Sequence, residues 1–181
     1  NVPGITYRDS SDEVHKNPKK EYDFDLDSFP FPARHLLKND FYLRPDTNKK
    51  LAILYTSRGC PALCTFCAVP LVSGNKLRRR SVESVIDEII LCQKTLEIND
   101  FFFFADTFNL DKKWVIKLCN EMIERNLNIQ WACNSRPDSI DLEMAQWMKK
   151  SGCGVVSFGI ETGSDDMLKQ IKKGNNVSHC E

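Results

Sequence analysis

Short apolar runs alternate with amphipathic runs from residue 51 to the end of the chain. The apolar runs predict strands at residues 51–55, 101–105, 129–133 and 155–160, and the second is fully apolar, as expected for a parallel strand covered on both faces. An amphipathic run with helical spacing follows each predicted strand. Four strand-helix units in series predict an α/β fold with parallel strands, either a doubly wound sheet or a barrel.

Each predicted helix begins at a residue whose side chain can accept a hydrogen bond from the free N–H groups of the first turn. These residues are Ser81, Asp111, Asp141 and Ser164. In the first helix, acidic side chains are predicted to favour the positive end of the helix dipole: Glu83, Asp87 and Glu88.

Residues 1–50 differ from the rest of the chain. They carry five of the eight prolines and show no sustained apolar period, which predicts an extended linker. Within it, the Phe-Pro-Phe-Pro-Ala-Arg segment at 29–34 is predicted to act as a strap that lays aromatic rings along a neighbouring surface. The chain starts without methionine and ends where a new segment would begin. We therefore expect a piece of a longer protein, with a linker at 1–50 after an N-terminal domain and a core at 51–181 truncated at its C-terminus.

The unusual polar residues of the core follow the predicted strands. Cys60, Asp106, Arg136 and Glu161 come shortly after the first, second, third and fourth strand. The carboxyl ends of parallel strands meet at one edge of a sheet, and the working loops of parallel α/β folds lie there. The sequence therefore predicts one shared site at this edge.

Three cysteines follow the first strand in the segment 57–67, Ser-Arg-Gly-Cys-Pro-Ala-Leu-Cys-Thr-Phe-Cys, with Phe66 just before the last. Thiolates of Cys60, Cys64 and Cys67 can hold three irons of a four-iron four-sulfur cluster and leave the fourth iron without a protein ligand. A structural zinc site would need a fourth ligand, and no paired cysteine or histidine follows at finger-like spacing. The bacterial ferredoxin run has four cysteines at a different spacing.

The cysteine spacing and Phe66 resemble the radical S-adenosylmethionine (radical SAM) superfamily, over about residues 51–173. The resemblance implies a partial (β/α) TIM-like barrel with about four of six strand-helix units. It also implies that Cys60, Cys64 and Cys67 bind the cluster and that Phe66 packs near the adenine of the cofactor. The segments 104–108 and 131–136, the opening 4–8 and the strap are most similar to the members that carry a cobalamin-binding domain.

The resemblance also implies roles for polar residues at the strand ends. Asp106 would meet the amino group of S-adenosylmethionine, although a turn or cap residue is the alternative. Ser135 and Arg136 lie on the predicted rim, where Arg136 is equally well a solvated charge. Glu161, between glycines, would accept from the ribose or bind the amino-acid part. Lys173 would meet the cofactor carboxylate, or only provide a favourable charge at a helix end.

As a function, the resemblance implies reductive cleavage of S-adenosylmethionine to a 5′-deoxyadenosyl radical, with an external electron donor of flavodoxin or ferredoxin type and a small-molecule substrate. The cobalamin-associated members methylate or cyclise such substrates, with cobalamin held by a domain outside this chain. One alternative is a methylthiotransferase-like enzyme, which a second cysteine trio upstream would support; residues 1–50 contain no cysteine. Another is a non-enzymatic iron-sulfur electron-transfer protein, which needs no rim carboxylates.

Composition narrows the setting. The chain has 25 basic and 25 acidic residues, so no general attraction to nucleic acid or to an anionic membrane is expected. The sequence has no apolar run of about 18 residues and no signal-like start. The run 78–80, three arginines, is either solvated surface or a group that holds an anion near the cluster. The remaining cysteines stand singly, which favours reduced thiols in a cytoplasmic protein: Cys92, Cys119, Cys133, Cys153 and Cys180.

Overall fold

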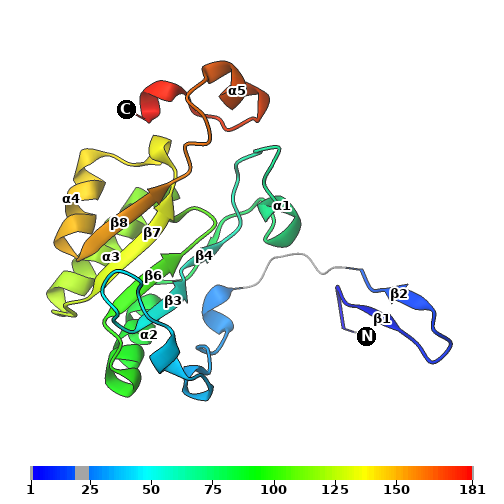
Figure 1. The fold of residues 1–181 in the computed structure, drawn as a ribbon, viewed down its shortest axis with the longest axis horizontal. Coiled ribbons are helices and arrows are strands. Elements are labelled where there is room, and N and C mark those ends of the chain that lie inside the picture. The colour runs from blue at the N-terminus through cyan, green and yellow to red at the C-terminus, as the bar shows by residue number, and fades with distance from the viewer. Residues whose placement is uncertain (1, 19–24, 181) are drawn as a thin grey trace.

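The computed structural model describes residues 2–18 and 25–180. Its centre is a four-stranded sheet (Figure 1) made of β3 (Leu51–Tyr55), β6 (Asp100–Phe104), β7 (Gln130–Ser135) and β8 (Cys153–Phe158). The strands pair in parallel in the order β3-β6-β7-β8. This confirms the four predicted strands to within two residues and leaves β3 and β8 at the edges.

A helix follows each of these strands: α2 (Val82–Leu96), α3 (Lys112–Glu124), α4 (Leu142–Lys150) and α5 (Asp165–Gln170). The predicted capping residues are confirmed, because the side chains of all four accept a hydrogen bond from a backbone N–H in the first turn: Ser81, Asp111, Asp141 and Ser164. The sequence did not predict the short elements between β3 and α2. These are β4 (Ser57–Arg58), α1 (Val69–Val72) and β5 (Arg78–Arg79), and β4 pairs with β5 in antiparallel fashion.

The hydrophobic core lies between one face of the sheet and the helices α2, α3 and α4. Alternate side chains of each strand point into it, and Phe101, Phe103 and Trp131 are at most 1% exposed. The rings of Phe103 and Trp131 stack with centroids 4.9 Å apart. Ile86 and Ile89 of α2 and Leu118 of α3 are fully buried in the same cluster.

The opposite face of the sheet is largely open in the described part of the chain. Ile53 is 51% exposed, Tyr55 46% and Phe104 37%. The prediction that the phenylalanine run is covered on both faces was therefore wrong, since only its alternate rings, at 101 and 103, meet the helices. Helices on one face of a parallel sheet correspond to the wall of a (β/α) barrel and exclude the doubly wound alternative.

The N-terminal region contains a hairpin that the sequence did not predict. Strand β1 (Thr6–Arg8) pairs with β2 (Val14–Lys16) in antiparallel fashion, and the hairpin lies to one side of the sheet in Figure 1. Asp9 closes the turn by accepting hydrogen bonds from the backbone N–H groups of Ser11 and Glu13. Residues 19–24 of the predicted linker lie outside the described residues.

The described chain resumes at residue 25 and leads into the strap, and polar contacts attach both to the core. Asp27 accepts from the backbone N–H of Ser81, at 2.9 Å. Arg34 contacts Glu88, with Nη1 and Oε1 2.5 Å apart, and donates to the carbonyl of Ile53 at 2.7 Å. Glu88 is only 1% exposed, so it is a buried partner of the strap as well as an acid in the first half of α2.

The arginine run 78–80 is not solvated surface as a whole. Arg78 is 8% exposed and Arg80 9%. Arg80 forms an ion pair with Glu88, lies over the ring of Phe31 at 5.4 Å and donates to the carbonyl of Tyr55. The run therefore helps to join the strap, β3 and α2.

None of the described helices is long and apolar enough to span a membrane.

Candidate functional site

The carboxyl ends of the four parallel strands lie at one edge of the sheet, and the cysteine loop, residues 59–67, lies there after β4. The loop begins at Gly59, whose φ of +87° places it in the left-handed region. The Gly59 N–H donates to Asp106 Oδ2, 2.6 Å away, and the Cys60 N–H donates to the carbonyl of Gly74 at 3.2 Å. The loop after β6 thus holds the start of the cysteine loop.

Polar groups surround the loop sulfurs. Cys60 is 8% exposed, and its Sγ lies 3.5 Å from the hydroxyl oxygen of Thr107. Cys67 Sγ accepts from the backbone N–H of Val69 at 3.4 Å. Cys64 is half-buried, and the Thr65 N–H donates to the carbonyl of Ile171 after α5 at 3.0 Å. The Val69 N–H at the sulfur of Cys67 can stabilise a thiolate and tune a cluster bound there, so this loop fits an iron-sulfur group.

Gly59 is the first position where a substitution tests this loop. A Cβ at residue 59 would lie 2.1 Å from the carbonyl oxygen of Lys76, and a side chain would also be strained at a φ of +87°. We expect Gly59→Ala to shift Cys60 and to lower the iron bound per chain after anaerobic reconstitution by at least about half. Gly154→Ala is the control, because its Cβ would meet nothing within 4 Å. Equal iron content in both variants would contradict this account of the loop.

A second group of predicted residues gathers beside the cysteine loop. Lys173, which is 7% exposed, places Nζ 2.9 Å from Glu161 Oε1 and 5.7 Å from the ring centroid of Phe66. Glu161 has a φ of +70°, a conformation that ordinary side chains adopt at some cost. The flanking Gly159 leaves room for this pair, because a Cβ there would lie 2.8 Å from Glu161 Oε1. The end of β8, the end of α5 and the cysteine loop therefore meet at one point.

Arg136 connects the end of β7 to the same region. Its guanidinium donates to Asp138 at 2.9 and 2.6 Å and to the carbonyl of Lys173 at 2.7 Å. The hydrogen bond to Asp138 raises the pKa of Arg136 above its usual value; burial opposes this shift, and Cys64 and Cys60 contribute to the increase by their charge. Arg136 is thus a fixed cation near the cysteine loop and not a freely solvated charge.

Two predicted residues have partners other than a ligand. The buried hydroxyl of Ser135 lies 3.7 Å from Cys133 Sγ, and Asp106 accepts from Gly59 in the cysteine loop. The roles predicted for them toward S-adenosylmethionine stay predictions. Sequence reasoning missed the contact of Asp106 with Gly59 and that of Thr107 with Cys60. Each contact joins residues that are 47 positions apart in the chain.

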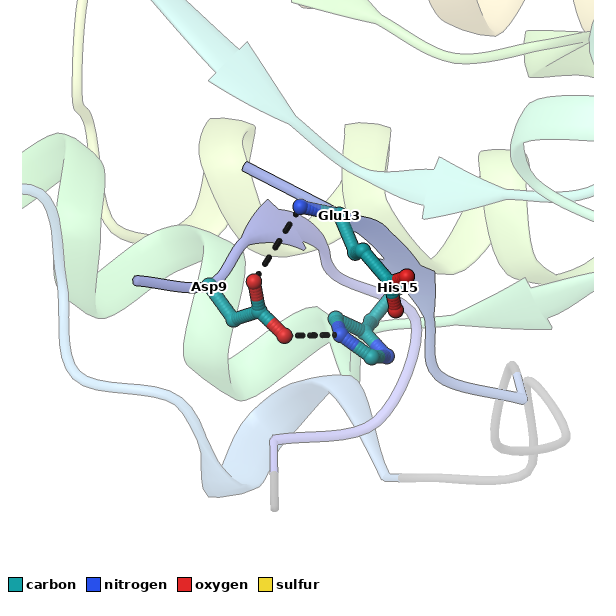
Figure 2. A group of neighbouring side chains, drawn as sticks. All are labelled: Asp9, Glu13 and His15. Carbon is teal, nitrogen blue, oxygen red and sulfur yellow. Dashed lines mark hydrogen bonds and ion pairs between the residues drawn. The ribbon is translucent and has the colours of Figure 1, made fainter. Parts of the chain in front are cut away.

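The hairpin carries a group of three possible metal ligands. In the described residues, only Asp9, Glu13 and His15 bring three possible ligand atoms within 4.8 Å of one another. Figure 2 shows that the Asp9 group lies on the hairpin, where His15 Nε2 is 2.7 Å from Asp9 Oδ2. The hydrogen bonds of Asp9 to Ser11 and Glu13 close the turn, and its hydrogen bond with His15 lowers the pKa of Asp9.

The remaining five cysteines are also free thiols, and four of them are buried. Burial raises the pKa of the Cys119 thiol to about 12 and also raises the pKa of Cys92. The hydrogen bond with Cys153, followed by burial, raises the pKa of Cys133. Neutral thiols are poor metal ligands, so Cys92, Cys119 and Cys133 are not expected to bind iron.

The comparisons with known proteins agree on one family. The model of the radical SAM superfamily matches residues 54–179. An uncharacterized methyltransferase of Pyrococcus horikoshii is 34% identical over 173 residues, which are 96% of this chain and 37% of that protein. A putative methylthiotransferase of Methanocaldococcus jannaschii is 31% identical over 183 residues, 96% of this chain and 38% of that protein. The chain thus spans less than two fifths of these relatives.

A solved structure shares the fold. It is the cobalamin-dependent S-adenosylmethionine radical enzyme OxsB with aqua-cobalamin and S-adenosylmethionine bound, with a TM-score of 0.81 and 23% sequence identity over 98% of this chain and 27% of that one. The likeness confirms a partial barrel of parallel strands. The family match and a relative that is 34% identical across 96% of the chain show that this chain belongs to the radical SAM superfamily.

Proposed function

We propose that this chain is the core of a radical SAM enzyme, with methyl transfer to a small molecule as its favoured reaction. Cys60, Cys64 and Cys67 would hold a 4Fe-4S cluster, and Phe66, Glu161 and Lys173 would contact S-adenosylmethionine. The observation that carries this proposal is the meeting of the Glu161–Lys173 pair with Phe66 beside the cysteine loop. Thiols alone would suit an electron carrier, whereas this group of polar side chains suits an organic ligand with amino, carboxylate and ribose parts.

The protein's own contribution is to position and to exclude water. When bound, the cluster and S-adenosylmethionine supply reductive cleavage to a 5′-deoxyadenosyl radical, with electrons from an external donor of flavodoxin or ferredoxin type. Lys173 is buried and paired with Glu161. It can pair with the carboxylate of a ligand in place of Glu161, and its positive charge then stays balanced by one carboxylate. Arg136, held by Asp138, keeps a positive charge near the loop and favours thiolates there.

Cobalamin would come from a domain outside this chain. The chain covers 37% of the Pyrococcus horikoshii relative, which leaves room for such a domain in the whole protein, and cobalamin is bound in the OxsB structure. We further propose a reducing, cytoplasmic location, which the free thiols favour.

The full-length protein tests this function directly. After anaerobic reconstitution, we expect the spectrum of the reduced cluster to change when S-adenosylmethionine is added, because only an open iron can respond. We also expect 5′-deoxyadenosine to form when a low-potential reductant is present. A cluster whose spectrum ignores S-adenosylmethionine would support the electron-carrier alternative and overturn the proposal.

Glu161 offers a second, independent test. Glu161→Ala should weaken binding of S-adenosylmethionine by about 1–3 kcal/mol, because it leaves buried polar groups unpaired, while the iron content stays unchanged. Asp106→Ala should lower both affinity and iron content, since Asp106 also holds Gly59. Isothermal titration of the reconstituted protein measures the affinity. Glu143→Ala is the control, because Glu143 pairs with Lys112 on the helix side of the sheet; equal affinities in the Glu161 and Glu143 variants would contradict the assignment.

A methylthiotransferase-like function is the second candidate, favoured by the name of the Methanocaldococcus jannaschii relative. Such an enzyme would hold a second cluster through another cysteine trio, and residues 1–50 supply none. Iron analysis of the full-length protein separates the two candidates. About four irons per chain would support the first proposal, and about eight would support the second.

A further inference from the structure

The strap covers a cavity that no residue of the proposed cofactor site lines. The cavity has a volume of about 400 Å³, within the range of small-molecule pockets. One wall is the strap, residues 29–32, with Leu26. The other wall comes from the end of β3, from β4 and β5, and from α1, which directly follows the cysteine loop: Tyr55, Arg58, Val72, Ser73, Arg78 and Arg80.

This cavity is held open by the structure around it. Arg80 is fixed by Glu88 and by the carbonyl of Tyr55, and the ring of Phe31 lies against it. Asp27 anchors the start of the strap to Ser81, as described above. A wall with buried ion pairs behind it does not collapse easily, so a ligand would find the cavity formed.

The cavity walls are largely apolar and carry three arginines, of which Arg58 is exposed. Phe29, Pro30 and Pro32 of the strap face Tyr55 and Val72 across the cavity. Arg58 is exposed, and its guanidinium lies 4.9 Å from the centroid of the Tyr55 ring. Arg80 is committed to Glu88, whereas Arg58 has no ion pair with an acidic residue in the described part of the chain. Aromatic rings accept the face of a planar molecule, and a guanidinium stacked on such a ring can bind a carboxylate or phosphate.

The cavity also leads toward the cysteine loop. A second cavity of about 330 Å³ shares with it the residues Tyr55, Arg58, Val72 and Ser73. Its other lining residues include Phe104, Asp106, Ala68 and Val69, and Val69 donates to the sulfur of Cys67. Ser57, which also lines it, has a buried hydroxyl with no hydrogen-bond partner among the described residues. A molecule seated under the strap would thus extend along Tyr55 and Phe104 to the edge where the cysteines lie.

We propose that the strap cavity binds a planar apolar molecule with one anionic group, with the rings of Tyr55 and Phe29 against its body and Arg58 on its anion. That this ligand is the acceptor substrate rests on the proposed function. The binding itself depends only on the cavity and its charge.

Two aromatic probes of the same shape test the ligand class on the full-length protein. One is 8-anilinonaphthalene-1-sulfonate, and the other is N-phenyl-1-naphthylamine, which lacks the sulfonate. Anaerobic equilibrium dialysis measures the binding of each without interference from coloured cofactors. We expect the sulfonate to bind at one site per chain and about tenfold more tightly than the uncharged probe. Equal affinities would overturn the anionic part of the proposal.

Variants then locate the site. Arg58→Gln should abolish the preference for the sulfonate and leave the uncharged probe unaffected, whereas Phe29→Ser should weaken both probes. Both side chains are exposed, so we expect these variants to fold. Arg125→Gln is the control, because Arg125 pairs with Glu121 at the end of α3. A sulfonate preference that survives in Arg58→Gln, or is lost in Arg125→Gln, would overturn the proposal.

The wild-type protein and the Arg58→Gln variant also show whether the ligand site and the proposed function fail independently. Formation of 5′-deoxyadenosine in wild-type protein, without an Arg58-dependent preference for the sulfonate, would retain the function and refute the cavity as its ligand site. An Arg58-dependent preference in a protein that cleaves no S-adenosylmethionine would retain the ligand site and refute the function.

Discussion

Cys64→Ala is expected to remove the iron-sulfur cluster, whereas Cys119→Ala is expected to keep it. The loop offers three thiolates to a four-iron cluster, so the loss of one leaves two irons without protein ligands. Cys119 lies in the helical core, where burial raises its pKa to about 12, and its neutral thiol is a poor ligand. The expected result is therefore nearly complete loss in one variant and wild-type iron content in the other.

Iron and sulfide analysis after anaerobic reconstitution measures this difference, with the absorbance of the cluster as a second readout. The matched variants Cys60→Ala and Cys67→Ala should behave like Cys64→Ala. A normal cluster in Cys64→Ala, or its loss in a Cys119→Ala variant with an unchanged circular dichroism spectrum, would refute the assignment of the ligands.

The sequence predicted the repeating part of the fold well because that part follows local rules. Ser81, Asp111, Asp141 and Ser164 are side-chain caps, and each acts on N–H groups a few residues away. The edge that carries the site was predictable for a similar reason. In a parallel sheet, every strand delivers its following loop to the same edge, whatever the sequence of the helices.

The sequence did not predict features that depend on distant partners. Glu88 looks like one more solvated acid of α2, but Arg34 reaches it from 54 residues earlier in the chain and makes it a buried group. Arg78 and Arg80 also look like part of a surface run, because the sequence does not show that both are buried. Elements of two to four residues, such as β4, β5 and α1, are too short to show a period.

Within the candidate site, the sequence indicated which residues belong to the site, but it did not indicate which partners they contact. It placed Glu161 and Lys173 at the cofactor separately, and the structure pairs them with each other at 2.9 Å. It assigned Asp106 to the cofactor, or to a turn or cap, and missed that Asp106 accepts from Gly59. Such contacts depend on the turn of the chain after a strand, which neither apolar spacing nor capping predicts.

Glu88→Ala is expected to destabilise the protein by about 3–5 kcal/mol. The Glu88 carboxylate is 1% exposed and forms ion pairs with Arg34 of the strap and with Arg80, which follows β5. Its removal leaves two cations close together, with side chains that are about one tenth exposed, and the remaining acid, Asp27, lies 3.9 Å from Arg80. Loss of one partner from a buried pair costs more than the pair contributes, because the remaining charge is desolvated and uncompensated.

Glu83→Ala on the same helix is the control for this experiment. Glu83 pairs with Lys117, but both side chains are more than half exposed, so its loss should cost less than about 1 kcal/mol. Urea unfolding of the full-length protein, followed by tryptophan fluorescence, reports on both variants, since Trp114 and Trp131 lie in or against the core. Limited proteolysis adds a second readout, because a strap released from Arg34 should be cut within residues 25–50 in the Glu88 variant alone. Similar midpoints and similar cleavage in the two variants would mean that the strap is held by its aromatic contacts and not by this buried carboxylate.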